Sequence, residues 1–377
     1  MEDIYQESVA CHLKARGKIA ISGKMPLKSK HDLSLAYTPG VAEVCRVIAS
    51  DRSRAKELTI KGNSVAVITD GSAILGLGNL GPEAALPVME GKCLLFKEFA
   101  DIDAWPICLD TQDEEEIIRT VKNLAPGFGG INLEDISAPR CFYIEDRLKA
   151  ELDIPVMHDD QHGTATVVLA GLINSLSLKG LQPEQAKVLI SGAGAAGWAI
   201  ARLLLEYGFK DVVLVDTQGA IYNGRPGLSK IKQEIASKTN PNLVNGSLEQ
   251  ALWGRDIFIG VSAPGILKAE MIKQMAQSPI IFALSNPVPE IMPDEAKAAG
   301  AFIVATGRSD FSNQINNVLV FPGIFRGALD NNLRDIKSSH LILAAKNLAA
   351  LVPNPTTDRI LPDPLDRSVA PAVAAAF

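Results

Sequence analysis

The sequence is poor in cysteine and has no long apolar run. Its 377 residues include five cysteines without a CxxC pair among them, namely Cys11, Cys45, Cys93, Cys108 and Cys141. This odd, widely spaced set argues against a disulfide framework or a zinc site and predicts reduced thiols. No apolar run approaches the roughly 18 residues that a membrane span needs, and the acidic start MEDIYQES is unlike a signal peptide. We therefore expect a cytoplasmic protein without a membrane contact.

Positive charge and aromatic side chains are also scarce. Asp and Glu outnumber Lys and Arg by 43 to 37, the formal net charge is −6, and no block of basic residues offsets the acids. This balance argues against nucleic-acid binding and favours a small-molecule substrate. A hydrophobic content of 47%, an aromatic content of 5% and 30 glycines are typical of an α/β enzyme. The length predicts two or three domains.

A glycine-rich turn lies between two apolar segments in the middle of the chain. The segment 188–190 precedes the turn, an Ala- and Leu-rich segment follows it to Tyr207, and a second apolar segment covers 212–215. This order predicts strand, turn, helix and strand, the Rossmann pattern that binds a dinucleotide at the helix N-terminus. Asp216 stands where an acidic side chain accepts hydrogen bonds from a ribose. The predicted cofactor-binding residues of the turn are Gly192, Ala193, Gly194, Ala195, Ala196 and Gly197.

Alternating strand and helix patterns predict two α/β domains. We expect strands near 64–69, 102–109, 129–133 and 154–157, and then near 187–190, 212–215, 257–261, 280–284 and 303–305. The dipeptide Asp70-Gly71 predicts a hairpin with a return strand from Ala73 to Leu77. The expected fold is an N-terminal α/β catalytic domain over residues 1–157 and a Rossmann-type, doubly wound parallel sheet over residues 158–377. The last part, from about residue 316, is expected to pack back on the first domain.

Two pairs of acidic residues follow predicted strands. Glu134-Asp135 ends the strand at 129–133, and Asp159-Asp160 ends the strand at 154–157. Ligands bind beyond the carboxyl ends of strands in open α/β sheets, so the acids meet at one place if the strands are neighbours. All-oxygen ligands suit Mg²⁺ or Mn²⁺. The alternative is that these acids cap the helices that follow them.

Other polar residues in apolar or turn settings are candidates for chemistry. Lys92 lies in an apolar segment and is either a partly desolvated base that is neutral near pH 7 or a lysine that extends to solvent. Tyr37 precedes Thr38-Pro39-Gly40 and is either a core aromatic or a proton donor. Asn286 and Asn317 are either ligand-binding amides or turn residues. The glycine-rich stretch 76–81 lets the backbone approach a ligand.

Together these pieces resemble the malic enzyme family, in its short microbial form, over essentially the whole chain. The matching motifs are AYTPGVA (36–42), TDG (69–71), GLGNLG (76–81), PVMEGK (87–92), GINLEDI (130–136), HDDQHGT (158–164), GAGAAG (192–197), SNP (285–287) and NNVLVFPG (316–323). The larger members carry an arginine for a malate carboxylate at the position of Ala73. The resemblance therefore implies that carboxylate recognition comes from elsewhere.

The resemblance also implies a role for each matching residue. Tyr37 matches the general acid, Lys92 the general base, and Asp159 the acid that holds the lysine. The implied metal ligands are Glu134, Asp135 and Asp160. The residues expected to contact malate or the nicotinamide are Gly76, Gly78, Asn79, Asn286 and Asn317.

The implied reaction is the metal-dependent oxidative decarboxylation of (S)-malate to pyruvate and CO₂ with reduction of a dinucleotide. Decarboxylation of added oxaloacetate is a possible side activity of the same site. NAD is favoured over NADP because the charge of Asp216 would meet the 2′-phosphate, and Thr217-Gln218-Gly219 offers no arginine to offset it. The alternatives are a malolactic conversion of malate to lactate and a catalytically silent dinucleotide-binding regulator. The family resemblance further implies a homodimer or a larger homo-oligomer.

Overall fold

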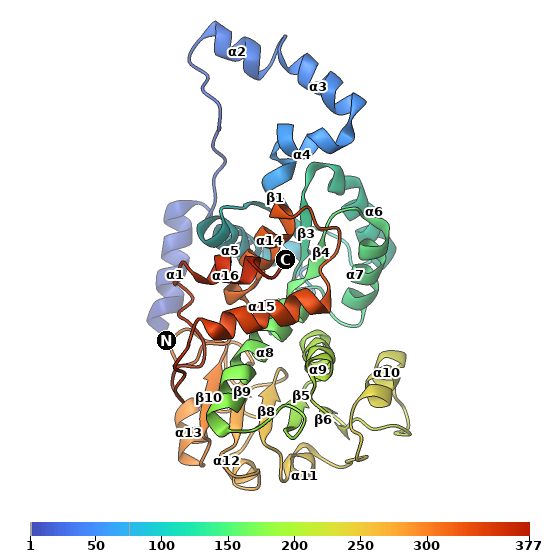
Figure 1. The fold of residues 1–377 in the computed structure, drawn as a ribbon, viewed down its shortest axis with the longest axis vertical. Coiled ribbons are helices and arrows are strands. Elements are labelled where there is room, and N and C mark those ends of the chain that lie inside the picture. The colour runs from blue at the N-terminus through green and yellow to red at the C-terminus, as the bar shows by residue number, and fades with distance from the viewer. Residues whose placement is uncertain (1, 75) are drawn as a thin grey trace.

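The computed structural model describes residues 2–74 and 76–377 and contains two sheets, one above the other in Figure 1. The first sheet has the strand order β2-β1-β3-β4 and the second the order β10-β9-β8-β5-β6-β7. All pairings are parallel except that of β7 with β6. Among the described residues no helix has both the length and the hydrophobicity that a membrane span requires. The predicted α/β fold class is confirmed.

The N-terminal part consists of helices and the first sheet. The elements before the sheet are α1 (Glu2–Ala15), α2 (Lys30–Ala36), α3 (Val41–Ser50), η1 (Arg52–Arg54), α4 (Ala55–Leu58) and η2 (Ile60–Asn63). The sheet follows with β1 (Ser64–Thr69), α5 (Pro82–Ala100), β2 (Asp103–Cys108), α6 (Glu114–Leu124), η3 (Ala125–Gly127), β3 (Gly130–Leu133), α7 (Arg140–Glu151) and β4 (Val156–His158). The helix α8 (Asp159–Lys179) then leads to the second sheet.

The central strand β1 is buried on both faces. Val65 and Val67 belong to the core that α5 and α14 share, whereas Ala66 and Ile68 pack in the core with α6 and α7. Because β2 and β3 flank β1 on its two edges, no edge of β1 is free for a return strand. The predicted hairpin over residues 73–77 is therefore wrong. Among the described residues, Gly71 has φ +68°, and Ile74 forms only an isolated bridge with Gly78.

The second sheet begins with the predicted strand, turn, helix and strand. These are β5 (Lys187–Ser191), α9 (Ala195–Tyr207) and β6 (Asp211–Asp216). The remaining elements are β7 (Gly219–Ala220), α10 (Lys230–Lys238), α11 (Leu248–Leu252), β8 (Ile257–Gly260), α12 (Ala269–Ile272), β9 (Ile280–Ala283), α13 (Pro293–Ala298), β10 (Ile303–Thr306) and η4 (Asn317–Leu319). Apolar side chains cover both faces of this sheet as well.

The last helices return from the second sheet to the first. They are α14 (Phe321–Asp330), α15 (Ser338–Ala350) and α16 (Val369–Ala374). Phe321 and Phe325 of α14 pack edge-on against Phe96 of α5, with ring centroids 4.8 and 5.5 Å away. Arg326 Nη1 donates to Asn63 Oδ1 at 2.7 Å. One continuous apolar core therefore joins the two sheets.

Candidate active site

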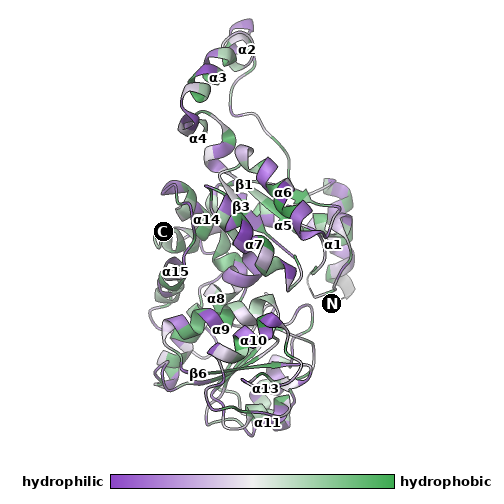
Figure 2. Cartoon of the chain, turned by 90° about the vertical axis from the view of Figure 1, so that its right-hand side faces the viewer, coloured by the Kyte–Doolittle hydropathy of each residue, from purple (hydrophilic) through white to green (hydrophobic). Residues whose placement is uncertain are grey.

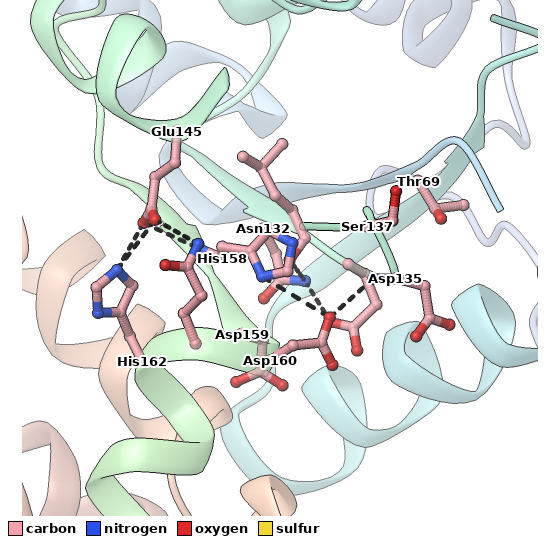
Figure 3. A network of polar contacts seen from close by, with 12 residues as sticks. Thr69, Asn132, Asp135, Ser137, Glu145, His158, Asp159, Asp160 and His162 are labelled. Atoms are coloured by element: carbon pink, nitrogen blue, oxygen red, sulfur yellow. Dashed lines mark hydrogen bonds and ion pairs between the residues drawn. The ribbon is translucent and has the colours of Figure 1, made fainter. Parts of the chain in front are cut away.

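Three carboxylates meet at the carboxyl ends of two neighbouring strands. Glu134 and Asp135 follow β3, and Asp160 lies in the first turn of α8, directly after β4, which pairs with β3. Each offers a ligand atom, and these atoms lie within 4.8 Å of one another. Figure 3 shows Asp135 and Asp160 side by side at this place. The structure therefore brings together the three acids that the sequence singled out for a metal.

The backbone around the cluster is strained and tightly bonded. Asp135 has φ +52°, a left-handed conformation that non-glycine residues rarely adopt. Its N–H donates to Asp160 Oδ2 at 2.9 Å, and its carbonyl accepts from the N–H of Ala73 at 2.9 Å. Strain of this kind persists where the surroundings hold it, and it is concentrated at functional sites.

Lys92 reaches the same cluster from α5. Its side chain is 9% exposed, its Nζ lies 2.9 Å from Glu134 Oε2, and it also pairs with Asp159. Asn317 Nδ2 donates to the same Asp159 oxygen at 2.5 Å. Gly163 leaves room for Asp159, because a Cβ at that position would lie 1.9 Å from Asp159 Oδ1. Asp159, which Asn317 holds, thus fixes the position of the Lys92 side chain.

The four carboxylates around Lys92 outnumber its single positive charge. Burial lowers the pKa of Lys92, but Asp159, Glu134 and Asp160 more than offset that effect, so the pKa lies above its ordinary value. The expectation of a neutral Lys92 is therefore not met with these neighbours alone. Burial and the charges of Asp160, Asp159 and Asp135 raise the pKa of Glu134 well above its ordinary value, although Lys92 opposes them. A divalent cation among these oxygens would relieve the repulsion, and the all-oxygen donor set fits Mg²⁺ or Mn²⁺.

Lys92 and the carboxylates line a cavity of about 470 Å³ between the two sheets, called here the Lys92 cavity. Its walls include Ala73, Gly76 and Ser137 from the N-terminal part, and Gly194, Ser262, Asn286, Asn316 and Asn317 from the other side. A second cavity of about 450 Å³, the Asp216 cavity, is also lined by Gly194 and Ser262. The two cavities therefore adjoin, and together they lead from the carboxylate cluster to Asp216.

The glycine turn has the shape that a dinucleotide site needs. Gly192 has φ +118°, and a Cβ there would lie 2.7 Å from Val261 O. A Cβ at Gly197 would lie 1.9 Å from Gly192 O, so this glycine allows the helix to approach the strand. A Cβ at Gly194 would meet nothing within 4 Å, and this residue faces both cavities. Ala193, Ala195 and Ala196 complete the turn in the cavity walls.

Asp216 is more fully paired than the sequence suggested. Its Oδ2 accepts from Arg225 Nη2 at 2.5 Å and from Lys232 Nζ at 2.6 Å, and Oδ1 accepts from Arg225 Nη1 at 3.0 Å. Burial opposes the ionised form, but these partners hold the pKa of Asp216 at about 2. The argument that no arginine offsets its charge is therefore wrong. Arg225 and Lys232 lie too far along the chain from Asp216 for a local motif to reveal them.

The predicted proton donor Tyr37 and the predicted substrate contacts Gly78 and Asn79 lie outside the described walls of the Lys92 cavity. Asn79 exchanges hydrogen bonds with Gln112, and Gly78 lies beside it in the loop. Tyr37 stands at the end of α2 and is 69% exposed. Their predicted roles remain predictions.

A buried carboxylate behind the cluster escaped the sequence analysis. Glu145 of α7 accepts from the N–H of His158 at 3.0 Å, from Gln161 Nε2 at 3.0 Å, and pairs with His162 Nε2 at 2.9 Å (Figure 3). It therefore holds the segment that carries Asp159 and Asp160. Its one sequence signal is that it stands on the apolar face of α7, between Cys141 and Leu148. His158 and His162 thus take supporting positions behind the cluster.

A second buried carboxylate supports the far wall of the cavity. Glu290 accepts from the N–H groups of Ser262 and Ser285, each at 3.0 Å. These serines follow β8 and β9 and line the Lys92 cavity. Burial raises the pKa of Glu290, although the backbone donors oppose this. Neither carboxylate belongs to a local motif, so both become visible only in the folded chain.

Comparisons with known proteins agree with this arrangement. The model of the malic enzyme N-terminal domain matches residues 16–149, and that of the malic enzyme NAD-binding domain matches residues 161–376. A bifunctional malic/malolactic enzyme of Bacillus subtilis is 54% identical over 98% of this chain and 91% of its own. An NAD-dependent malic enzyme of Geobacillus stearothermophilus is 58% identical over 89% of this chain and 70% of its own.

Solved structures give the same answer. The crystal structure of an NAD-dependent malic enzyme from Thermotoga maritima superposes with a TM-score of 0.95 at 51% identity, covering 98% of each chain. Both family models together span nearly the whole sequence. Lys92, Glu134, Asp135 and the glycine turn lie within the matched segments, and Asp160 directly precedes the second one. The chain therefore belongs to the malic enzyme family.

Proposed function

We propose that this protein converts (S)-malate to pyruvate and CO₂ while it reduces NAD, with a divalent metal ion. The observation that carries the proposal is the arrangement of Lys92 against three converging carboxylates, in a cavity that adjoins the glycine turn. Hydride transfer to a nicotinamide requires the substrate and the dinucleotide to meet, and the adjoining cavities supply such a place.

Glu134, Asp135 and Asp160 would hold Mg²⁺ or Mn²⁺. The bound cation would polarise the C2 oxygen of malate, stabilise the negative charge that decarboxylation creates, and lower the pKa of Lys92 by repulsion. Lys92 accepts the proton of the C2 hydroxyl as hydride leaves C2, and Asp159 and Asn317 keep its Nζ in place. Tyr37 would donate the proton that C3 requires after CO₂ has left.

The substrate carboxylates need partners other than the arginine that Ala73 replaces. Among the described residues that line the Lys92 cavity, Lys92 is the one cation. We infer that the amides of Asn286 and Asn317 and the backbone around Gly76 orient the dianion. Only glycine allows the backbone at position 76 to approach Asn286 this closely, because a Cβ at Gly76 would lie 2.5 Å from Asn286 O. Gly78 and Asn79 would act only if the glycine-rich loop moves toward the cavity.

NAD is the favoured cofactor, and NADP is accepted less well. A relative at 58% identity is NAD-dependent, whereas one from Rhizobium meliloti at 49% identity is NADP-dependent. In this chain Asp216 opposes a 2′-phosphate, but Arg225 and Lys232 give its surroundings a positive balance. We also infer that the protein acts in the cytoplasm as a homodimer or a larger homo-oligomer, with its five cysteines as free thiols.

A malolactic reaction is the second candidate, because the B. subtilis relative is named for both activities. In that reaction the reduced dinucleotide would stay bound and reduce pyruvate to lactate. A silent regulatory role is disfavoured, since Lys92 and the four acids around it are all present and grouped. The same site would also decarboxylate added oxaloacetate.

The test is a spectrophotometric assay at 340 nm with L-malate, Mn²⁺ or Mg²⁺, and NAD or NADP. Metal-dependent absorbance that matches the pyruvate formed would support the malic reaction. Lactate without a net rise in absorbance would support the malolactic reaction instead. No consumption of malate under any condition would contradict both.

A further inference from the structure

A network of polar side chains connects the two loops that form the N-terminal wall of the Lys92 cavity. One loop follows β1 and supplies Ala73 to the wall, and the other follows the neighbouring strand β3 and supplies residues 134–138. The N–H of Ser137 donates to Ser72 Oγ at 2.9 Å, and this hydroxyl donates to Asp70 Oδ1 at 2.5 Å. The network therefore holds the carboxyl ends of two strands together beside the cavity.

Arg140 closes this network from the first turn of α7, a largely hydrophilic helix beside the first sheet (Figure 2). Its Nη2 donates to Asp70 Oδ2 at 2.9 Å and to Ser137 Oγ at 3.1 Å, and its Nη1 donates to the carbonyl of Gln112. The Arg140 side chain is 19% exposed, and the fully buried Asp70 balances its charge. Three acceptors around a planar guanidinium fix it in one position. Arg140 itself does not line the described walls of the cavity.

Ser137 is the member of the network that reaches the cavity together with Arg140's hydrogen bond. It is half-buried and lines the wall two residues after Asp135. Its Oγ accepts from Arg140, and no residue that the structure describes accepts its hydroxyl hydrogen. Donation from a charged guanidinium polarises a hydroxyl and strengthens the hydrogen bond that the hydroxyl can donate in turn. Ser137 thus offers a fixed O–H group whose hydrogen is not yet used.

The other hydroxyls of the cavity walls lack this support. They belong to Thr164 on α8 and to Ser262 and Ser285 after β8 and β9. Ser262 Oγ pairs with Ser191 Oγ at 3.1 Å, which is a contact between two neutral groups. Among the described wall residues, only the hydroxyl of Ser137 accepts a hydrogen bond from a cationic side chain. The network therefore singles out one hydroxyl on the side of the carboxylate cluster.

The charges of the cavity explain why such a donor is useful to a dicarboxylate. Lys92 is the one cation among the described wall residues, and Glu134 and Asp159 already engage it. Malate brings two carboxylates, and the C4 carboxylate leaves as neutral CO₂. A direct ion pair would stabilise the charge of this group before it leaves and would oppose its loss. A polarised neutral hydroxyl orients the group without that cost.

We propose that Ser137 binds the C4 carboxylate of malate through its hydroxyl, and that Arg140 is the positioning residue that holds and polarises this hydroxyl. Asp70 and the carbonyl of Gln112 in turn keep the guanidinium in place. Ser137 thereby selects dicarboxylates over ligands without the second carboxylate. This inference rests on the proposed function and names a group that recognises the substrate in the same site.

Equilibrium binding separates recognition of this carboxylate from catalysis. Malate or oxalate is titrated into the protein with Mn²⁺ and NADH, and the fluorescence of NADH reports binding. The dinucleotide is already reduced, so malate is not oxidised during the titration. Oxalate can chelate a metal ion but has no group that corresponds to C4. Ser137→Ala should weaken malate binding by about tenfold and oxalate binding by less than about twofold. Equal losses for the two ligands, or no loss for malate, would overturn the proposal.

Arg140→Gln tests whether the arginine acts through the hydroxyl. Alone it should weaken malate binding by about fivefold, and in the Ser137→Ala protein by less than about twofold, because the oxygen that it polarises is then missing. Arg147→Gln is the matched control on the same helix, since Arg147 pairs with Glu115 and Glu151 and should leave malate binding unchanged. Additive losses in the double variant would overturn the positioning role of Arg140.

Failure of the proposed function would give a different result. Malate binding that Ser137→Ala weakens, in a protein that forms neither pyruvate nor lactate, would keep the carboxylate site and contradict the proposed reaction. Malate oxidation by a wild-type protein whose Ser137→Ala variant binds malate equally well would keep the reaction and overturn the role of Ser137. Unchanged NADH affinity and far-ultraviolet circular dichroism in each variant exclude unfolding as the cause of a loss.

Discussion

The cavity around Lys92 and the segment that carries Tyr37 are built in opposite ways. Lys92, Glu134 and Asp159 are buried, and contacts from α5, β3, α8 and η4 hold them in place. Tyr37 is exposed on a pair of helices without a buried residue. The residues proposed to bind metal and to take a proton are thus held by buried contacts. The residue proposed to return a proton is not.

The largest effect is expected from the buried side of this comparison. Lys92→Met removes the base and its ion pairs with Glu134 and Asp159, so kcat for malate oxidation should fall by about 10³-fold. Binding of NAD, measured by fluorescence titration, should stay unchanged because Lys92 does not line the Asp216 cavity. Lys97→Met on the same helix is the control, since Lys97 is half-exposed and pairs with surface acids. Equal losses in both variants would contradict the role of Lys92.

Glu145→Gln tests whether the buried support behind the carboxylates matters to the metal. The change removes the charge that holds His158, Gln161 and His162, so Asp160 should lose its fixed position. Affinity for Mn²⁺, measured by electron paramagnetic resonance, should fall by about 10- to 100-fold. NAD affinity should stay within about twofold, which separates a local effect from general unfolding. Glu151→Gln, at the end of the same helix, is a matched control that should leave Mn²⁺ binding unchanged.

The same carboxylate predicts a pH dependence of stability. Burial would raise the pKa of Glu145, but His162 and the neighbouring cations lower it to about 2. Because the unfolded value is about 4.3, the stabilisation is complete above that pH and is lost as the pH falls toward 2. The free energy of unfolding, from urea titrations, should therefore decline by on the order of 3 kcal/mol across this window. The Glu145→Gln protein should decline less over the same range, and an identical decline would exclude Glu145 as the cause.

Lys232→Ala is expected to have the smallest effect, at the far end of the adjoining cavities. Lys232 lines the Asp216 cavity and offsets the charge of Asp216, so its loss should disfavour a 2′-phosphate. kcat/KM with NADP should fall by about tenfold, and kcat/KM with NAD should change by less than about twofold. Lys238→Ala, on the same helix and paired at the surface with Glu234, provides the control. An equal loss with both cofactors would mean that Lys232 supports the fold and does not select the cofactor.

Local patterns predicted where the glycine turn and the acidic pairs stand in the fold, because the end of a strand is set by residues close to it in the sequence. The glycine turn, Glu134-Asp135 and Asp159-Asp160 each follow a strand that its own apolar residues define. The hairpin failed for the converse reason. Asp70-Gly71 favours a turn locally, but β1 is already paired on both edges, so the return strand has no place.

The features that sequence analysis missed are contacts between segments that lie far apart in the chain. Arg225 and Lys232 reach Asp216 only after β7 and α10 fold over it, and Glu145 reaches His158 from the preceding helix. The motif around Tyr37 predicted a proton donor but gave no signal of where its side chain lies. The structure places it at the end of α2, where it is exposed, and its role stays a prediction.

The most direct test of this comparison is the hydroxyl of the exposed tyrosine. Tyr37→Phe removes one oxygen from a side chain that is 69% exposed and leaves the buried carboxylates and Lys92 as they are. The variant should keep the far-ultraviolet circular dichroism of the wild type and bind Mn²⁺ and NAD with wild-type affinity. It should nevertheless form pyruvate at least about 10²-fold more slowly. Wild-type pyruvate formation by Tyr37→Phe would contradict the account.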